Sequence, residues 1–299
     1  MATFEYCRNI VPQLTQSIGS GSFGKVYYDK KYNMAIKVFR PGDEKITSKE
    51  VANMVELTNI VLDHKRKDIV IPLIGHDNKL LISYKFMAME YCDGGTLYNI
   101  INMRSQTERK YYNYKCFKMI DQIICGINFL HENNIVHLDL KPDNILISNN
   151  NIKISDFGSA FILPSKHCLC ISMMTTNLYA SPDYFLGSYN PFHLDVWSLG
   201  IIIFQLLTAK NPWNTAKLTD HMFKSWTIEI SNNLQLSGNI YHFNNEYPEI
   251  YQYISEHIWC SPFLRKHNVT NRTQTSIKDI KRYFHMINKK TTKEFMKNQ

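Results

Sequence analysis

The sequence predicts an α+β protein with two lobes, a small β-rich lobe followed by a larger helical one. Its 299 residues are 44% hydrophobic, which is more apolar material than one small core would hold. Before Cys92, short runs rich in β-branched and aromatic residues alternate with Gly, Lys and Asn turns. After Gly95, apolar residues recur at helical spacing over long stretches. We therefore expect a first lobe over 1–91, a hinge over 92–95, and a second lobe over 96–299 that ends in a basic tail.

The elements of the small lobe follow from local patterns. Strand-like runs cover 9–21, 23–32, 33–40, 69–75 and 80–91. Between the third and fourth runs, Val51, Met54 and Leu57 lie close to helical spacing, which predicts a helix over 48–62. Thr47 or Ser48 is the expected N-cap of that helix.

The second lobe is expected to be mainly helical. Residues 111–134 and 194–213 form its two clearest helical patterns. The run 199–207 is the most apolar in the chain, but a membrane-spanning helix needs about 20 such residues. We therefore interpret it as a buried helix and expect no membrane contact.

Cysteine usage points to a reducing compartment. The seven cysteines are scattered and odd in number, which is typical of intracellular chains. Cys168 and Cys170 beside His167 suggest zinc, yet no second Cys/His pair of suitable spacing lies nearby. The N-terminus lacks the pattern of a secretory signal. We expect an intracellular protein of the cytoplasm, the nucleus or both.

Positive charge gathers at the end of the chain. The formal net charge is +8, and after Arg265 only Asp279 and Glu294 oppose the Lys and Arg residues. A solvated helix face is the favoured interpretation of this tail. Contact with an acidic partner or with nucleic acid is the alternative.

A glycine-rich stretch lies near the start of the chain. Gly19, Gly21 and Gly24 follow the order G-x-G-x-x-G, which lets backbone approach phosphate oxygens closely. A structural hairpin could use the same letters. A dinucleotide-binding fold would require a helix next, whereas strand-like sequence follows here.

A lysine lies within the apolar run that follows the glycines. Lys37 stands between Ile36 and Val38, and a strand lysine near a glycine-rich loop is suited to holding phosphates if a carboxylate orients it. The next helix offers Glu50 and Glu56. Glu50 is favoured because its neighbours at helical spacing are apolar, but both remain open at this point.

The segment 135–160, IVHLDLKPDNILISNNNIKISDFGSA, sets polar residues among apolar ones. Burying a charge is costly unless it is paired or bound to a metal. HLDLKPDN followed by SDFG resembles the catalytic and metal-binding loops of eukaryotic-type protein kinases. IGSGSFGKV, AIK, MEYCDGG and DVWSLG stand in the expected order, so the resemblance covers about 18–213 and extends loosely to 272. It implies the bilobal protein-kinase fold.

The resemblance also implies roles for individual residues. Asp139 would accept or orient the hydroxyl proton, and Lys141 would steady the γ-phosphate of ATP. Lys37, paired with Glu50, would hold the α- and β-phosphates, and Asn144 and Asp156 would hold Mg²⁺. The remaining nucleotide-binding positions are the glycine-rich loop and the adenine pocket: Ile18, Gly19, Ser20, Gly21, Ser22, Phe23, Gly24, Lys25, Val26, Ala35, Met89, Glu90, Cys92 and Leu146.

Two positions indicate the class of kinase. Lys141 in DLKPDN is typical of serine/threonine kinases, and Thr176 stands where those kinases have a threonine that contacts the catalytic Asp. Leu138 is a departure, because most members have Arg there; the Mos kinases share the HLDLKP form. The abundance of Asn, Ile, Lys and Tyr suggests an AT-rich genome, such as that of a large DNA virus or a protist.

The predicted function is therefore a serine/threonine protein kinase that uses ATP and Mg²⁺ and acts on Ser/Thr hydroxyls of proteins. Because Leu138 cannot bind a phosphate, we expect activity without phosphorylation of the activation segment at Ser172. The alternatives are a pseudokinase, which binds nucleotide or partners without turnover, and a basic scaffold associated with nucleic acid.

Overall fold

The computed structural model describes most of the chain. The residues that it describes are 14, 17–21, 24–42, 44–64, 73–77, 86–103, 109–164, 175–187, 189–232, 235–260, 264 and 275–296. Ser22, Phe23, Cys168, Cys170 and Ser172 lie outside these ranges. Of the predicted strand over 9–21, only Leu14 and residues 17–21 lie inside them.

The chain divides into two compact units. Residues 1–95 and 146–160 form the first, and 96–145 and 161–299 form the second. Residues 146–160, which the sequence pattern assigned to the second lobe, thus group with the first unit. Main-chain hydrogen bonds explain this grouping, because Gly94 N–H donates to Ile147 O and Ile147 N–H donates to Gly95 O, both at 2.9 Å. A β-rich unit and a helical unit confirm the predicted α+β class.

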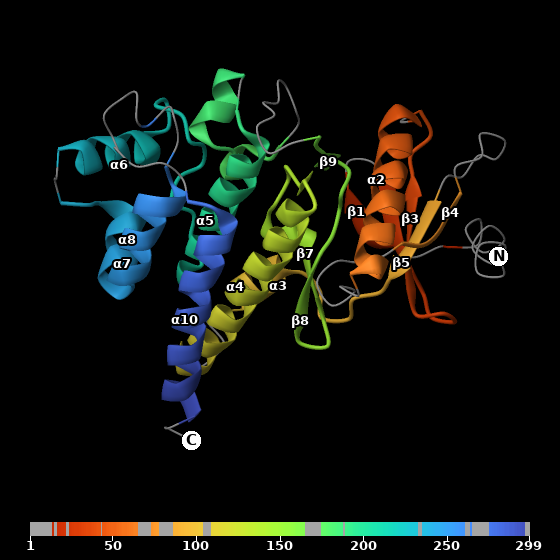
Figure 1. Cartoon of the computed structure of the whole chain (residues 1–299), viewed down its shortest axis with the longest axis horizontal. Helices are drawn as coiled ribbons and strands as arrows, with labels where there is room; N and C mark the ends of the chain where they lie inside the picture. The colour runs from red at the N-terminus through yellow and green to blue at the C-terminus, as the bar shows by residue number, and fades with distance from the viewer. Residues whose placement is uncertain are drawn as a thin grey trace. The chain divides into compact units, whose positions relative to one another are not determined.

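The first unit is built on a five-stranded antiparallel sheet in the order β1-β2-β3-β5-β4 (Figure 1). Its core includes Met34 and Ile36 of one strand and Phe86 and Ala88 of its neighbour, which form one buried apolar cluster. Lys37 lies on the middle of the central strand, opposite Val26 on one side and Met87 on the other. The strands are β1 Ser17–Gly21, β2 Gly24–Asp29, β3 Met34–Phe39, β4 Leu73–Asp77 and β5 Phe86–Glu90.

One long helix, α2 Glu44–Asp63, accompanies this sheet. Its buried residues Val51, Met54 and Leu57 form the predicted apolar face. The predicted N-cap at Thr47 or Ser48 is wrong, since both residues lie inside the helix. Gly42, with a φ of 97°, lies in a turn just before the helix.

A small hairpin completes the first unit. It consists of β7 Ile145–Ser148 and β8 Asn151–Ile154. Asn149 and Asn150 connect the strands with φ values of 51° and 61°. Asparagine tolerates this left-handed conformation better than most residues, which suits a two-residue hairpin turn.

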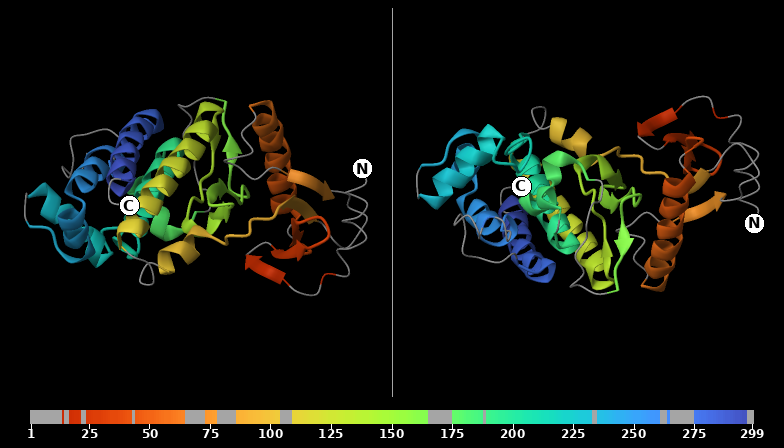
Figure 2. Two further views of the ribbon diagram at one scale, coloured as in Figure 1. Left: turned by 90° about the horizontal axis from the view of Figure 1, so that it is seen from below. Right: turned by 90° about the horizontal axis from the view of Figure 1, so that it is seen from above.

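The second unit is helical, and its longest helices are α4 Arg109–Glu132, α5 Pro191–Thr208 and α10 Ile277–Met296. Helix α10 lies along α4 (Figure 2), where Asn288 donates to Asp121 at 3.3 Å. The smaller elements are α3 Leu97–Asn102, β6 Ile135–Val136, η3 Pro142–Asn144, β9 Phe161–Ile162, η4 Asn177–Tyr179, η5 Pro182–Leu186, α6 His221–Ser231, α7 Gly238–Glu246, α8 Pro248–Tyr253 and the π-helical turn η6 Ile254–Ile258.

Helix α5 forms the centre of the second unit. Asn190 caps its start by accepting from Phe192 N–H at 2.9 Å. The helix is long and apolar enough to cross a membrane, yet 89% of it is buried within the structure. This burial identifies it as a core helix, as the sequence predicted.

Four tryptophans pack together against the middle of α5. The ring centroid of Trp213 lies 4.9 Å from that of Trp259 and 5.1 Å from that of Trp226. Trp197 belongs to the same cluster and lies on α5 itself. Gly200 lies one turn further along and leaves the space that Trp259 fills, since a Cβ added there would lie 2.4 Å from the Trp259 indole nitrogen.

Replacing Gly200 by Ala should therefore destabilise the second unit. The new methyl group would overlap Trp259 and Ile258, and overpacking of this kind costs about 1 to 3 kcal/mol. Urea denaturation followed by tryptophan fluorescence would measure the change. An unfolding midpoint at or above that of the wild type would contradict the close approach.

Candidate active site

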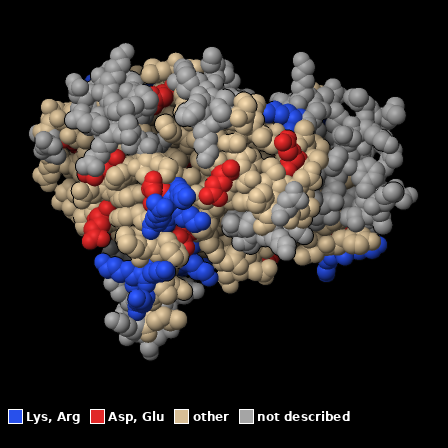
Figure 3. All heavy atoms as spheres, in the orientation of Figure 1, with Lys and Arg blue, Asp and Glu red and all other residues tan. Residues whose placement is uncertain are grey.

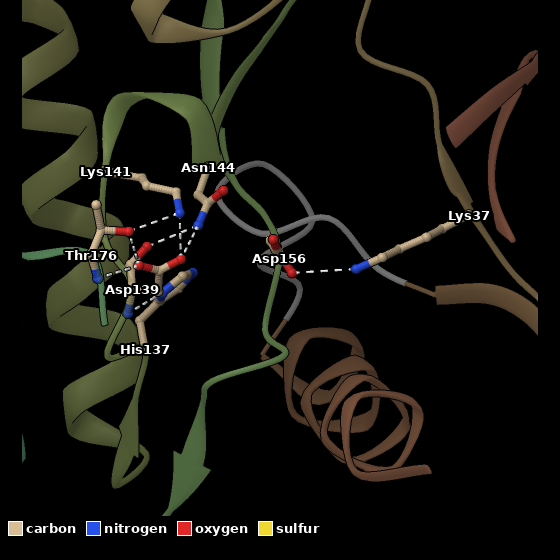
Figure 4. Close-up of polar contacts among 7 residues, drawn as sticks. All are labelled: Lys37, His137, Asp139, Lys141, Asn144, Asp156 and Thr176. Atoms are coloured by element: carbon tan, nitrogen blue, oxygen red, sulfur yellow. Dashed lines mark hydrogen bonds and ion pairs between the residues drawn. The ribbon is translucent and has the colours of Figure 1, made fainter. Parts of the chain in front are cut away.

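The polar residues singled out from the sequence gather in two groups, one in each unit (Figure 4). Lys37, Glu50 and Asp156 form the group in the first unit. Asp139, Lys141, Asn144 and Thr176 form the group in the second.

In the first unit, Lys37 contacts two carboxylates. Its ammonium lies 2.5 Å from Glu50 and 3.4 Å from Asp156, and Figure 4 shows the Lys37 side chain pointing to Asp156. Burial disfavours the charged form of Lys37, but the two carboxylates outweigh it and raise the pKa of Lys37 above its ordinary value. Lys37 therefore carries a fixed positive charge at neutral pH.

In the structure, Lys37 pairs with Glu50 and not with Glu56. Glu50 is fully buried on the inner face of α2 and bonds the lysine, whereas Glu56 is exposed. The sequence favoured Glu50 because of its apolar neighbours, and this preference is confirmed.

Asp156 has a conformation that few residues adopt. Its φ of 62° lies in the left-handed region, which is strained for residues other than glycine. Its side chain remains 43% exposed while it contacts Lys37. The backbone thus holds a carboxylate against the lysine and leaves much of that carboxylate accessible.

The glycine-rich loop spans the β1–β2 turn, of which Ile18, Gly19, Ser20, Gly21, Gly24, Lys25 and Val26 are described. Position 24 requires glycine, because the backbone of β3 lies so close that a Cβ there would be 2.4 Å from Val38 O. Ile18 is 51% exposed.

Two positions predicted to line an adenine pocket are neighbours in the sheet of the first unit. Ala35 is paired with Met89 across β3 and β5. Glu90 follows Met89, and its carboxylate accepts from Lys153 at 2.5 Å and from Ser148 at 3.3 Å, which ties the strand end to the β7–β8 hairpin.

Cys92 and Leu146 are two further residues that were predicted to line the adenine pocket and that the structure describes. Cys92 is buried, and burial together with the nearby Glu90 carboxylate raises the pKa of its thiol to about 12. The Cys92 thiol is thus inert near neutral pH. Leu146 lies in β7 and is half-buried.

In the second unit, four donor groups surround the Asp139 carboxylate. Oδ1 accepts from Thr176 N–H at 3.1 Å and from Thr176 Oγ1 at 2.8 Å. Oδ2 accepts from Lys141 Nζ at 2.6 Å and from Asn144 Nδ2 at 3.3 Å. Thr176 Oγ1 also accepts from Lys141 at 3.0 Å. These bonds fix both the position and the rotation of the carboxylate.

A further aspartate holds the backbone of this group. Asp195, on α5, is buried and accepts from His137 N–H at 2.9 Å and from Leu138 N–H at 2.8 Å. His131 lies 3.0 Å from the same carboxylate. Sequence reasoning gave no role to Asp195, although a charge inside a long apolar helix was a signal that it needed partners.

Comparison with known proteins agrees with this geometry. The model of the protein kinase domain matches residues 13–297. The chain belongs to the eukaryotic-type serine/threonine protein kinase superfamily.

Curated relatives of this kinase domain are themselves serine/threonine kinases by name. The chain is 29% identical over 235 residues to the serine/threonine-protein kinase chk-1 of Caenorhabditis elegans, which covers 73% of the chain and 44% of the relative. It is 34% identical over 222 residues to the probable serine/threonine-protein kinase MARK-C of Dictyostelium discoideum, over 71% and 27% of the two proteins. Each relative is thus more than twice as long as the matched region. The Mos-like and viral interpretations stay predictions.

Leu138, the departure from the kinase pattern, is buried in an apolar cluster. Its neighbours are Val136, Tyr189, Phe192 and Leu194, and it has a left-handed φ of 66°. Phe161, Leu163 and Tyr184 pack against this cluster. Leu138 therefore belongs to an apolar cluster that contains residues from both sides of 165–174.

Changing Thr176 to Val should lower phosphotransfer with little loss of stability. Valine keeps the shape and the main-chain bond to Asp139 but removes the hydroxyl that links Asp139 and Lys141. Loss of orientation at a reacting group costs about 10- to 100-fold in rate. Initial rates on a mixed Ser/Thr peptide substrate would measure the effect. Thr176→Ser, which keeps the hydroxyl, should stay near the wild-type rate; equal rates for the two variants would show that the hydroxyl is unimportant.

Proposed function

We propose that this chain transfers the γ-phosphate of ATP to Ser and Thr hydroxyls of protein substrates. The observation that carries the proposal is the Asp139 carboxylate, fixed by Lys141, Thr176 and Asn144. A carboxylate whose rotation is set by neighbouring donors can accept or orient the proton of an incoming hydroxyl. The membership in the kinase superfamily and the names of the relatives support the same activity.

Phosphoryl transfer asks the protein mainly for positioning and for compensation of negative charge. Lys37 would hold the α- and β-phosphates, since Glu50 fixes its ammonium. Lys141 would steady the γ-phosphate, because its ammonium already lies beside Asp139. Both lysines are thus oriented by carboxylates before a nucleotide arrives.

The donor set fits Mg²⁺. Asp156 offers a carboxylate that is 43% exposed, and Asn144 directs its amide nitrogen to Asp139 O at 2.8 Å, so its oxygen is the end that suits a cation. Among the described residues, no group of three or more His, Cys, Asp or Glu could hold a metal ion. One carboxylate and one amide oxygen suit Mg²⁺, because this ion is usually held by one or two protein oxygens, substrate phosphates and water. The ion would neutralise phosphate charge.

The nucleotide base would lie against apolar residues of the first unit. Ala35 and Leu146 would contact the two faces of adenine together with Ile18 and Val26. Main-chain groups of Glu90 and Cys92 would meet its edge, and the bond from Lys153 to Glu90 supports a fixed position for that strand end.

Two other functions remain as alternatives. A pseudokinase would bind nucleotide or partners without turnover, and a basic scaffold would bind nucleic acid through charge. The complete set of oriented polar groups around Asp139 and Lys37 favours turnover over both.

The decisive experiment compares Asp139→Asn and Lys37→Met with the wild type, using labelled ATP, Mg²⁺ and a mixture of acidic and basic proteins. Each change removes a positioned charge, so each should reduce transfer roughly a thousandfold or more. Lys224→Met, at an exposed position of α6, is the matched control and should keep the wild-type rate. Equal label transfer by the wild type and the Asp139→Asn variant would refute the assignment.

We also propose that activity needs no phosphate on the activation segment. Leu138 offers no donor for a phosphate, and its burial among Tyr189, Phe192 and Leu194 supports anchoring of the segment ends by apolar contact. Ser172, the predicted phosphate position, lies outside the described residues.

Phosphatase treatment should therefore leave most of the activity, and Ser172→Ala should do the same. Leu138→Arg should not increase activity while Ser172 is unmodified, because its guanidinium would be forced into an apolar cluster at a cost in stability. Initial rates before and after treatment, with mass spectrometry to verify removal of phosphate, test this prediction. Silencing of the enzyme by phosphatase would overturn it.

The basic tail is best explained as a solvated surface. Lys278, Lys289, Lys290 and Lys293 are exposed on α10, and Figure 3 shows Lys and Arg in this region with Asp and Glu among them. On α10 itself Asp279 pairs with Arg282 at 3.0 Å, and charges as exposed as these are usually solvated. Binding of an acidic partner or of nucleic acid through these lysines is the alternative, and strong salt dependence would characterise it.

The chemistry of the cysteines supports an intracellular location. The seven cysteines are scattered along the chain and odd in number, which is typical of proteins from a reducing compartment. We propose the cytoplasm or the nucleus on this ground.

A further inference from the structure

A polar side chain on α2 bonds the loop that carries Asp156. Asn53 lies three residues after Glu50, and residues at this spacing share one face of a helix. Its amide nitrogen donates to Phe157 O at 3.1 Å and to Ala160 O at 2.8 Å. One side chain therefore bonds the backbone on both sides of Gly158.

The two carbonyls belong to a single turn. Ala160 N–H donates to Phe157 O at 3.1 Å, so residues 157–160 close on themselves directly after Asp156. Asn53 bonds the first and the last carbonyl of that turn. A side-chain amide has two N–H donors, which is the number that this contact needs.

The residue before the turn is the one under conformational strain. Asp156 adopts a left-handed φ of 62°, and such conformations persist only where the surroundings hold them. Phe157 is buried, and a Cβ added at Gly158 would lie 3.4 Å from Glu50 Oε2. The turn is thus packed closely against α2 at the position of the glutamate that holds Lys37.

We propose that Asn53 is a positioning residue that makes α2 and the Asp156 loop move as one body. Lys37 bonds Glu50 on the helix and Asp156 on the loop. Both bonds can exist at once only while helix and loop keep their relative position, and the Asn53 amide links the two directly. This inference rests on the proposed function for its effect on turnover, but not for the contact itself.

Two substitutions separate hydrogen bonding from packing. Asn53→Ala removes both donors. Asn53→Asp keeps the shape but places carboxylate oxygens against two carbonyl oxygens, so it should disturb the loop more than alanine does. Asn59, exposed on the same helix, provides the controls Asn59→Ala and Asn59→Asp with the same changes in helix propensity and charge.

Hydrogen–deuterium exchange of the full-length variants tests the contact without any assay of activity. Exchange in a peptide that spans 156–161 should become about tenfold faster in Asn53→Ala and faster still in Asn53→Asp, while the Asn59 variants should match the wild type. Urea denaturation would identify any variant that is globally unfolded. Unchanged exchange in both Asn53 variants would overturn the proposal, as would equal acceleration in the Asn59 variants.

Kinetics then test the consequence for the site. The Mg²⁺ concentration for half-maximal turnover should rise about tenfold in Asn53→Ala, because Asp156 is less well held, while KM for the peptide substrate should stay unchanged. An equal loss in all kinetic parameters would show a merely structural role and would also overturn the proposal. If the wild type shows no phosphotransfer, the proposed function fails, and the exchange data still decide whether Asn53 positions the loop.

Discussion

The buried carboxylate of Asp195 is the constraint on which the backbone of the polar group around Asp139 depends. A charge inside the most apolar helix of the chain would be costly without partners. It finds them in the main-chain N–H groups of His137 and Leu138 and in His131. These bonds hold Leu138 in its left-handed conformation, and the next residue is Asp139. The left-handed backbone just before Asp139 is thus held by a helix more than fifty residues away in sequence.

In the first unit, the largely buried Lys37 is the residue on which the polar group depends. Lys37 remains charged because Glu50 and Asp156 together compensate for its burial. The two carboxylates come from a helix and from a loop, so the charge of one side chain links elements that are distant in the chain. Asn53 adds a neutral link between the same two elements. Polar contacts therefore decide how this unit is organised around Lys37.

Leu138 shows how an apolar residue can replace a charged one at a site built from charges. Its side chain extends the cluster of Tyr189, Phe192 and Leu194, against which Phe161, Leu163 and Tyr184 also pack. Apolar contacts are always present, whereas a phosphate contact can be switched.

The sequence by itself determined the α+β class and the order of the motifs, because these follow from local pattern and residue chemistry. The contact of Thr176 with Asp139 was expected from the resemblance to protein kinases. The sequence also favoured Glu50 over Glu56 through the apolar neighbours of Glu50. Only the tertiary structure decided where α2 begins, that 146–160 belong with the first unit, and that Asp195 and Asn53 support the two polar groups. These features depend on contacts between residues far apart in the chain, and local pattern carries no record of which distant backbone groups a side chain will meet.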